Sequence, residues 1–191
     1  MGQLEDALRS VVTVLGEQGI PYMLIGGMAN LVWGEARTTQ DIDVTVQVDP
    51  AALSETIARL AQIFRVLPEN PLAFVKRTRV LPVATANGIR ADLIFAELPY
   101  QEEAIRRARS VRLGDTEVRV CSPEDLIIHK IISERSKDLE DVKGIIRTQG
   151  THLDRAYLDP LVFGLAVDLE RPEIRRYYLS LWRKPRSRKK S

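Results

Sequence analysis

The sequence is poor in the residues that form covalent or metal cross-links. Cys121 is the only cysteine among 191 residues, which excludes an internal disulfide framework and fits a reducing compartment such as the cytoplasm. The two histidines, His129 and His152, have no cysteine or histidine partner at a metal-binding spacing. A zinc site is therefore not expected.

Long apolar runs are also missing. The run "PYMLIGGMANLVW" contains glycines and is shorter than the roughly 20 apolar residues that a membrane-spanning helix needs. The first residues, "MGQLEDALRS", include acids and lack the basic-then-apolar pattern of a secretion signal. We therefore expect a cytoplasmic protein with no membrane association. Hydrophobic residues at 45% and charged residues at 28% are typical of a soluble globular protein.

Positive charge is concentrated at the C-terminus. The formal net charge is +2, but residues 183–191 contain six of the 28 basic residues, so the rest of the chain has 22 basic against 26 acidic residues. A short basic tail of this kind is expected to be disordered. It could hold a polyanion or simply increase solubility, and the composition leaves both interpretations open.

The pattern of apolar residues and turns predicts an α/β protein followed by a helical region. Alternation and helical periodicity predict helices and strands in the following order: helix 4–19, strand 22–27, helix 28–34, strand 41–48, helix 51–64, two strands within 74–98 joined at Asn87-Gly88, a basic helix 101–111, strand 117–121, and four helices between 122 and 182. We expect an α/β core at 1–121, a helical region at 122–182 and a basic tail at 183–191.

Two aspartates interrupt the predicted strand "QDIDVTV". Side chains at i and i+2 of a strand point the same way, so Asp41 and Asp43 should lie side by side. Like charges this close repel unless a cation lies between them. Either that face is open to water, or the two carboxylates hold a metal ion. A third acid, Asp92, lies on the less apolar face of the strand that follows Asn87-Gly88.

A glycine pair precedes these acids. Gly26 and Gly27 end a predicted strand and open a helix, where exposed backbone N–H groups favour an anion and glycine allows a phosphate to approach. Each feature alone has an ordinary structural explanation: a chain reversal for the glycines and a solvated strand face for the acids. Their combination and order suit Mg²⁺ shared between carboxylates and substrate phosphates, as in in-line phosphoryl or nucleotidyl transfer.

These motifs resemble those of a known superfamily. The stretch "IGGMANLVWGEARTTQDIDVTV" is similar to the signature of the polymerase-β-like nucleotidyltransferases. The stretch "SPEDLIIHKIISERSKDLEDV" resembles the helical motif of AbiEii/AbiGii-type (DUF1814-like) nucleotidyltransferases. The resemblance spans about residues 21–145, and it implies a nucleotidyltransferase fold with a mixed sheet flanked by helices. It departs from the family at Lys137-Asp138, where many members have Arg-Asp.

The resemblance also implies a role for individual residues. Asp41, Asp43 and Asp92 would be the catalytic acids and metal ligands, with Asp92 the base for the acceptor hydroxyl. The residues that would bind the nucleoside triphosphate are Gly26 and Gly27 at the phosphate turn, Arg37 before the acids, and Lys130 with Asp138 in the helical half. Judged from spacing alone, the charges of that half are a solvated helix face with modest ion pairs, an interpretation that we keep for Asp141.

The expected activity is the transfer of a nucleoside monophosphate from an NTP to a hydroxyl, with Mg²⁺ or Mn²⁺ and release of pyrophosphate. The family context favours an RNA acceptor such as tRNA and a toxin of a toxin–antitoxin or phage-defence system, with a cognate antitoxin as partner. The basic residues Arg106, Arg107 and Arg109 and the C-terminal tail are compatible with RNA. A small-molecule acceptor, as in antibiotic nucleotidyltransferases, and a non-catalytic nucleotide-binding module are the alternatives.

Overall fold

The structure, a computed structural model, describes residues 2–133 and 135–182. The basic tail expected at 183–191 lies outside these residues. The chain divides into two compact units. Unit 1 comprises residues 1–32 and 36–122, and unit 2 comprises residues 33–35 and 123–191. We describe each unit by itself.

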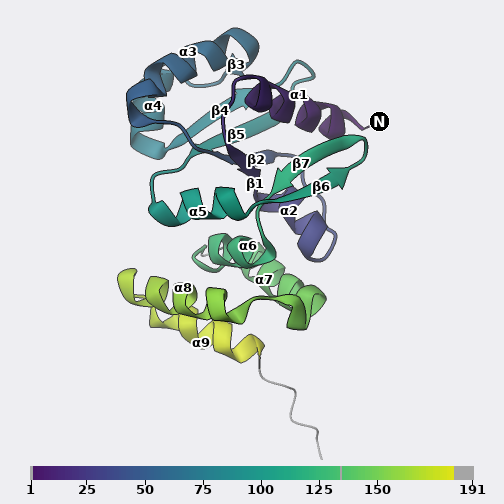
Figure 1. Ribbon diagram of the computed structural model, residues 1–191, viewed down its shortest axis with the longest axis vertical. Helices are drawn as coiled ribbons and strands as arrows, with labels where there is room; N and C mark the ends of the chain where they lie inside the picture. Colours follow the sequence, from purple (N-terminus) through teal and green to yellow (C-terminus); the bar gives the residue numbers. More distant parts are fainter. Residues whose placement is uncertain (1, 134, 183–191) are drawn as a thin grey trace, which may run out of the picture. The chain divides into compact units, whose positions relative to one another are not determined.

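Unit 1 is built on a mixed β-sheet (Figure 1). Within the described residues the strand order is β3-β4-β5-β2-β1-β7-β6. The strands are β1 (Tyr22–Leu24), β2 (Ile42–Val46), β3 (Arg65–Val66), β4 (Val80–Ala84), β5 (Arg90–Phe95), β6 (Arg109–Leu113) and β7 (Thr116–Val120). The β2–β5 and β1–β7 pairs are parallel, and the other neighbouring pairs are antiparallel. The predicted mixed sheet is confirmed.

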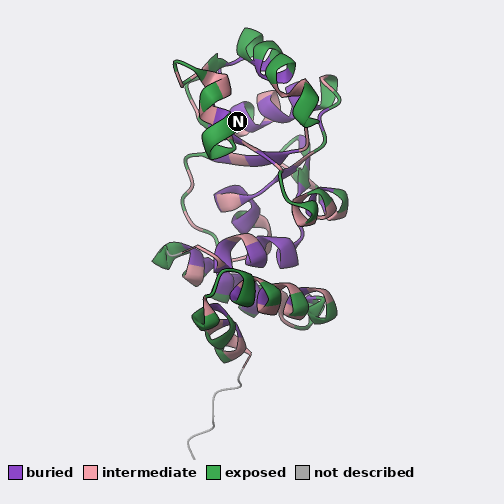
Figure 2. Ribbon diagram, turned by 90° about the vertical axis from the view of Figure 1, so that its left-hand side faces the viewer, coloured by how far each residue is buried: buried purple, intermediate pink, exposed green. Residues whose placement is uncertain are grey.

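Helices cover the sheet of unit 1, and the strands β1, β2 and β4 are largely buried (Figure 2). The helices are α1 (Gln3–Glu17), α2 (Gly26–Trp33), the short 3₁₀ turn η1 (Pro50–Ala52), α3 (Leu53–Ile63), α4 (Pro71–Thr78) and α5 (Pro99–Arg107). The apolar stripe expected on the first helix is confirmed, because Leu8, Val11 and Leu15 are fully buried. Asp49 caps η1 by accepting a hydrogen bond from the Ala51 N–H at 2.8 Å.

Two local predictions for unit 1 are wrong. The stretch from Phe74 to Thr78, which we expected to be extended, belongs to α4, because the Asn70 side chain caps that helix and Pro71 opens it. Arg109, expected on the basic helix, is the first residue of β6, since α5 ends at Arg107. The predicted hairpin at Asn87-Gly88 is confirmed: it joins the antiparallel strands β4 and β5.

Unit 2 is helical, as predicted. It contains α6 (Pro123–Ile131), α7 (Ser136–Gln149), the 3₁₀ turn η2 (Gly150–His152), α8 (Arg155–Asp168) and α9 (Pro172–Leu181). The chain turns between α6 and α7, so Lys130 and Lys137 do not share one continuous helix. Asp125 on α6 accepts a hydrogen bond from the Tyr157 hydroxyl on α8 at 2.7 Å, and the Tyr177 hydroxyl on α9 donates to the Leu139 carbonyl at 2.6 Å. These bonds connect the helices of the unit.

Across residues 2–133 and 135–182, we find no helix with the length and apolar character needed to span a bilayer.

Candidate active site

The pairing of β2 with β5 brings the second and third predicted acids together. In this parallel pair Asp43 lies directly opposite Asp92. The flanking pairs, Ile42 with Ala91 and Val44 with Leu93, are fully buried, so the two aspartates share the opposite, more open face. Asp41 immediately precedes β2 and is exposed. The backbone register thus holds Asp92 beside Asp43, and Asp41 lies two residues before Asp43.

The basic side chain of Arg90, which was not among the predicted site residues, lies beside these acids. Arg90 and Asp92 are two apart on β5 and so point to the same face. The Arg90 Nε and Nη2 atoms donate to the two oxygens of Asp92 at 2.9 and 3.2 Å. The pKa of Arg90 is raised, mainly by this hydrogen bond and further by the negative charges of Asp92, Asp41 and Asp43. The i, i+2 spacing of Arg90 and Asp92 in the predicted strand is the signal that could have identified Arg90.

Gly26 is required by both its conformation and its neighbours. Its φ of +67° lies in the left-handed region that L side chains rarely adopt. A Cβ on Gly26 would lie 2.0 Å from Oδ2 and 2.9 Å from Cβ of Asp43. The backbone at the start of α2 thus packs directly against the Asp43 carboxylate. Ile25 reinforces this approach, because its N–H donates to the Asp43 carbonyl at 2.9 Å.

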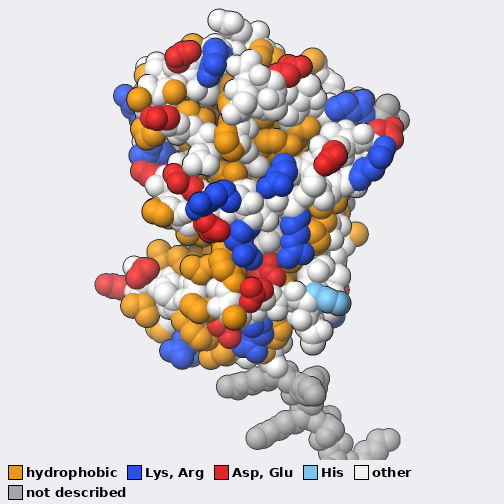
Figure 3. All heavy atoms as spheres, in the orientation of Figure 1, with side chains coloured by type: hydrophobic (Ala, Val, Ile, Leu, Met, Phe, Trp, Pro, Cys, Tyr) orange, Lys and Arg blue, Asp and Glu red, His pale blue; other side chains and the backbone are white. Residues whose placement is uncertain are grey.

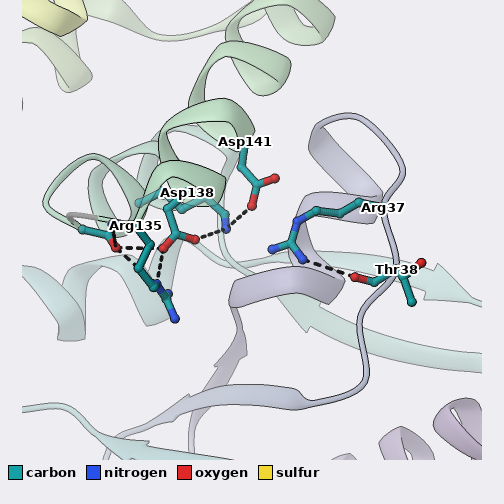
Figure 4. Close-up of polar contacts among 7 residues, drawn as sticks. Arg37, Thr38, Arg135, Asp138 and Asp141 are labelled. Carbon is teal, nitrogen blue, oxygen red and sulfur yellow. Dashed lines mark hydrogen bonds and ion pairs between the residues drawn. The ribbon is translucent and has the colours of Figure 1, made fainter.

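Gly27 and Arg37 lie together at the same end of α2. A Cβ on Gly27 would lie 2.4 Å from the Thr39 Oγ1 atom and 3.7 Å from an Nη1 atom of Arg37. Arg37 donates from Nη1 to the Thr38 carbonyl at 3.3 Å (Figure 4). The N-terminus of a helix with an arginine beside it favours an anion such as phosphate. Asp41 and five other predicted site residues therefore lie on unit 1. These five are Gly26, Gly27, Arg37, Asp43 and Asp92.

The donor chemistry of this face fits a hard divalent cation, because carboxylate oxygens are the ligands that Mg²⁺ prefers. Among the described residues, no group of three or more His, Cys, Asp or Glu side chains is arranged to hold a metal ion. Mg²⁺ usually needs only one or two carboxylates and takes its other ligands from water and substrate phosphates. Asp43 and Asp92, paired in register, are the two carboxylates that the chain would supply.

A pocket of about 460 Å³ opens beside the acids on unit 1. It is lined by the start of α1, the segment before β2 and the end of the β4–β5 hairpin: Gln3, Leu4, Thr39, Gln40, Asp41, Gly88, Ile89 and Arg90. Its volume is within the range of small-molecule binding sites. Asp41 and Arg90 line this pocket, and the charge of Arg90 also interacts with Asp41, Asp43 and Asp92.

The two predicted site residues of unit 2 form a buried charge cluster. The Lys130 ammonium donates to Asp138 at 3.2 Å and to Asp141 at 2.6 Å, and all three side chains are at most 6% exposed. Ser133 and Arg135 donate to the other oxygen of Asp138 at 2.8 and 2.5 Å, and Figure 4 shows Asp138 and Asp141 extending from α7. Lys130 thus joins α6 to α7. Asp141, which we expected on a solvated face, is buried and binds Lys130 at the shorter distance.

This cluster sets the protonation of its members. Burial alone would raise the pKa of Asp138, but hydrogen bonds from Ser133, Lys130 and Arg135 and the Lys130 charge lower it. The pKa of His129 is lowered to about 4 by burial and by the charge of Lys130, so this histidine is neutral at pH 7. The lowered pKa of Asp138 means that its carboxylate is ionised at neutral pH.

A known family of proteins matches most of the chain. The family model described as "Nucleotidyl transferase of unknown function (DUF2204)" matches residues 4–169. It agrees with the nucleotidyltransferase resemblance of the sequence, but it does not name the AbiEii/AbiGii type. A search of curated proteins gives no match.

Solved structures of nucleotidyltransferases have the same fold. The antibiotic-resistance factor ANT(2'')-Ia is 16% identical, with a TM-score of 0.53 over 92% of this chain and 93% of that one. The lincosamide antibiotic adenylyltransferase LnuA is 15% identical, with a TM-score of 0.51 over 74% and 95%. An antigenic nucleotidyltransferase-like protein from Paracoccidioides brasiliensis is 16% identical, with a TM-score of 0.51 over 89% of each chain. At these identities the likeness establishes the fold.

The close contact between Gly26 and the Asp43 carboxylate predicts the effect of adding a methyl group at position 26. Gly26→Ala should lower the free energy of unfolding by about 1–3 kcal/mol and displace the Asp43 carboxylate, because an L residue is strained at positive φ. Gly19→Ala is the matched control: its φ is +64°, but nothing lies within 4 Å of the added Cβ. Chemical denaturation should show a loss in both variants. Transfer activity should fall only in Gly26→Ala, and equal activity in the two variants would contradict the assigned contact.

The Lys130 cluster predicts a large structural effect from one charge. Lys130→Met should destabilise the protein by about 3–5 kcal/mol, because it leaves two buried aspartates without their shared cation. Lys143→Met removes an exposed pair with Glu140 and should cost about 1 kcal/mol or less. Urea denaturation measures both. Similar losses for the two variants would show that Lys130 does not stabilise the packing of α6 on α7.

The lowered pKa of Asp138 predicts a contribution to acid stability. Because this pKa is below its ordinary value of about 4, ionised Asp138 stabilises the fold above that value, and the contribution disappears as the pH falls through the folded-state pKa. Between pH 5 and pH 2.5, Asp138→Asn should therefore lose less unfolding free energy than the wild type. The exposed Asp168→Asn is the control and should follow the wild type. Identical pH dependence for Asp138→Asn and wild type would contradict the assignment.

Proposed function

Because the chain belongs to the DUF2204 family of nucleotidyl transferases, we propose that it moves a nucleoside monophosphate from an NTP to a hydroxyl group with the help of Mg²⁺ or Mn²⁺. The observation that carries this proposal is the in-register pairing of Asp43 with Asp92 beside the glycine turn of α2. Three acids, a helix N-terminus and a nearby arginine gather on one unit. Carboxylates that can hold a divalent cation and a helix N-terminus that attracts phosphate suit this reaction.

Each group has a role in the proposed reaction. Asp43 and Asp92 hold the cation, which would offset the negative charge that develops on the phosphates during transfer. The start of α2, with Gly26 and Gly27, attracts the triphosphate, and the Arg37 charge adds to that attraction. Asp92 accepts the proton of the acceptor hydroxyl. Asp41 adds negative charge at the same face and lines the neighbouring pocket.

In unit 2, Lys130 is the proposed triphosphate contact and Asp138 its partner. Their hydrogen bond of 3.2 Å supports a role for Asp138 in orienting Lys130. Asp141 holds the same ammonium at 2.6 Å, so the lysine is positioned by two acids instead of one. The Lys130 side chain is only 5% exposed and both acids bind its ammonium, so contact with a triphosphate requires the ammonium to leave at least one of them.

The pocket beside Asp41 and Arg90 supports a small hydroxyl-bearing acceptor, since its volume of about 460 Å³ suits a small molecule. The similar folds described above include an antibiotic-resistance factor and a lincosamide antibiotic adenylyltransferase, which agrees with an acceptor of this class.

An RNA acceptor is the second candidate, supported by a basic surface. Lys and Arg side chains are spread over the face that carries α5 and the β6–β7 hairpin (Figure 3). Several of them are paired: Arg106 with Glu103 at 2.5 Å and Arg112 with Asp115 at 4.0 Å. These acids offset part of the charge available to a phosphate backbone. We therefore place RNA after a small molecule.

The toxin role and the AbiEii/AbiGii assignment rest on the resemblance of residues 122–142 alone. If the protein is a toxin, its induced expression should stop bacterial growth, and Asp43→Asn should restore it. Growth that is unaffected by the active protein would contradict the toxin role and leave the proposed reaction in place.

The proposed reaction predicts that two acids are indispensable. With each labelled NTP, Mg²⁺ and either total tRNA or a panel of aminoglycosides and lincosamides, Asp43→Asn and Asp92→Asn should lower label transfer at least about a hundredfold, because each removes charge stabilisation of the transition state. The exposed Asp115→Asn is the control and should retain wild-type transfer. The arm that accepts label identifies the acceptor class. NTP binding without transfer in either arm would favour a non-catalytic module.

A further inference from the structure

Arg90 lies on the same strand face as Asp92, and the proposed reaction gives it no role. It donates to both oxygens of Asp92, in the fork geometry that suits guanidinium and carboxylate. Asp92 is the third acid of the proposed site, and its side chain is 21% exposed, so this ion pair is only partly screened by water. Both oxygens of a carboxylate that would bind a cation are thus already engaged by a cation that belongs to the chain.

The surroundings explain why a cation is needed there. The register of β2 and β5 fixes Asp43 opposite Asp92, at a strand spacing of about 4.8 Å. Two carboxylates this close repel each other, and Asp41 adds a third negative charge. The Arg90 charge interacts with all three acids, and its strongest contact is with Asp92. In the absence of a bound metal, the guanidinium therefore offsets the repulsion that the sheet register imposes.

Arg90 also has space into which it can move. Its side chain is 53% exposed and lines the pocket of about 460 Å³ beside Asp41. Its three-carbon stem allows the guanidinium to leave Asp92 without a change in the backbone of β5. A divalent cation, with twice the charge, can displace it at the Asp92 oxygens.

We propose that Arg90 is a positioning residue that holds the Asp92 carboxylate beside Asp43 while the site contains no divalent cation, and gives up that carboxylate when a cation binds. The inference rests on the proposed function to the extent that Asp92 is taken as a metal ligand. Arg90 and the cation then compete for the same oxygens. As a result, the affinity for the cation is set partly by the strength of the Arg90–Asp92 pair.

The test measures cation binding without nucleotide, acceptor or catalysis. The full chain is titrated with Mn²⁺, and free Mn²⁺ is followed by electron paramagnetic resonance. Arg90→Gln should bind Mn²⁺ about tenfold more tightly than the wild type, because a unit charge near the cation is removed. Arg90→Lys keeps the charge but loses the fork, and it should lie between the two. Arg112→Gln, which breaks an exposed pair with Asp115, should bind like the wild type.

A double variant separates positioning from general charge. In an Asp92→Asn background, replacing Arg90 with Gln should produce little of the gain in Mn²⁺ affinity, because the contested carboxylate is gone. A full gain in that background would overturn the positioning role. Equal or weaker binding by Arg90→Gln alone, or no Mn²⁺ binding by any variant, would overturn the competition. Thermal unfolding of each variant shows that it is folded.

Failure of this inference is distinguishable from failure of the proposed function. If Mn²⁺ affinity depends on Arg90 as described but no acceptor is labelled, the inference stands and the transfer reaction falls. If label is transferred and depends on Asp43 and Asp92 while Mn²⁺ affinity is indifferent to Arg90, the reaction stands and the inference falls.

Discussion

The parallel pairing of β2 with β5 is the constraint on which the site of unit 1 depends. It fixes Asp43 opposite Asp92 in the register of the backbone, so no side-chain rearrangement can separate them far. Like charges held in this way destabilise a sheet unless a cation offsets them. Arg90 supplies such a cation from the chain itself, and Gly26 leaves the space that the Asp43 carboxylate occupies. Arg90 and Gly26 thus both accommodate the unfavourable pair of carboxylates, Asp43 and Asp92.

Unit 2 also places two aspartates around one cationic side chain, but there all three charged side chains are buried. There a single lysine lies between two buried acids, and the hydrogen bonds of Ser133 and Arg135 complete the coordination of Asp138. Removing charges from water is costly, and the cost is offset only when the geometry is good and the remaining oxygens are bonded. On unit 1 the Arg90 side chain is 53% exposed and that of Asp92 is 21% exposed, whereas the three charged side chains of the Lys130 cluster are at most 6% exposed.

The sequence predicted most of the fold because its helices and strands carry clear periodicity. The helical periodicity of α1 and the Asn87-Gly88 hairpin each have a local signal that tertiary contacts do not override. β6 lacks such a signal because it is largely exposed, whereas α4 has a local start signal, Asn70 followed by Pro71, that the prediction overlooked. In the candidate site, the acids and glycines were predicted from their order. Arg90 was overlooked although its i, i+2 spacing from Asp92 is a local signal. Asp141 was missed because its contact with Lys130 depends on how α6 packs against α7.

The strands that carry Asp43 and Asp92 are neighbours in the sheet but are separated in sequence by α3, β3, α4 and β4. A contact between such distant segments forms only after the entropy of closing the intervening chain has been overcome, which generally slows folding. During synthesis α1, β1, α2 and β2 emerge before β5, and the face that carries Asp43 and Asp92 remains incomplete until β5 joins the sheet. A partly made chain would therefore carry the glycine turn and the first two acids without the ability to act on a nucleotide.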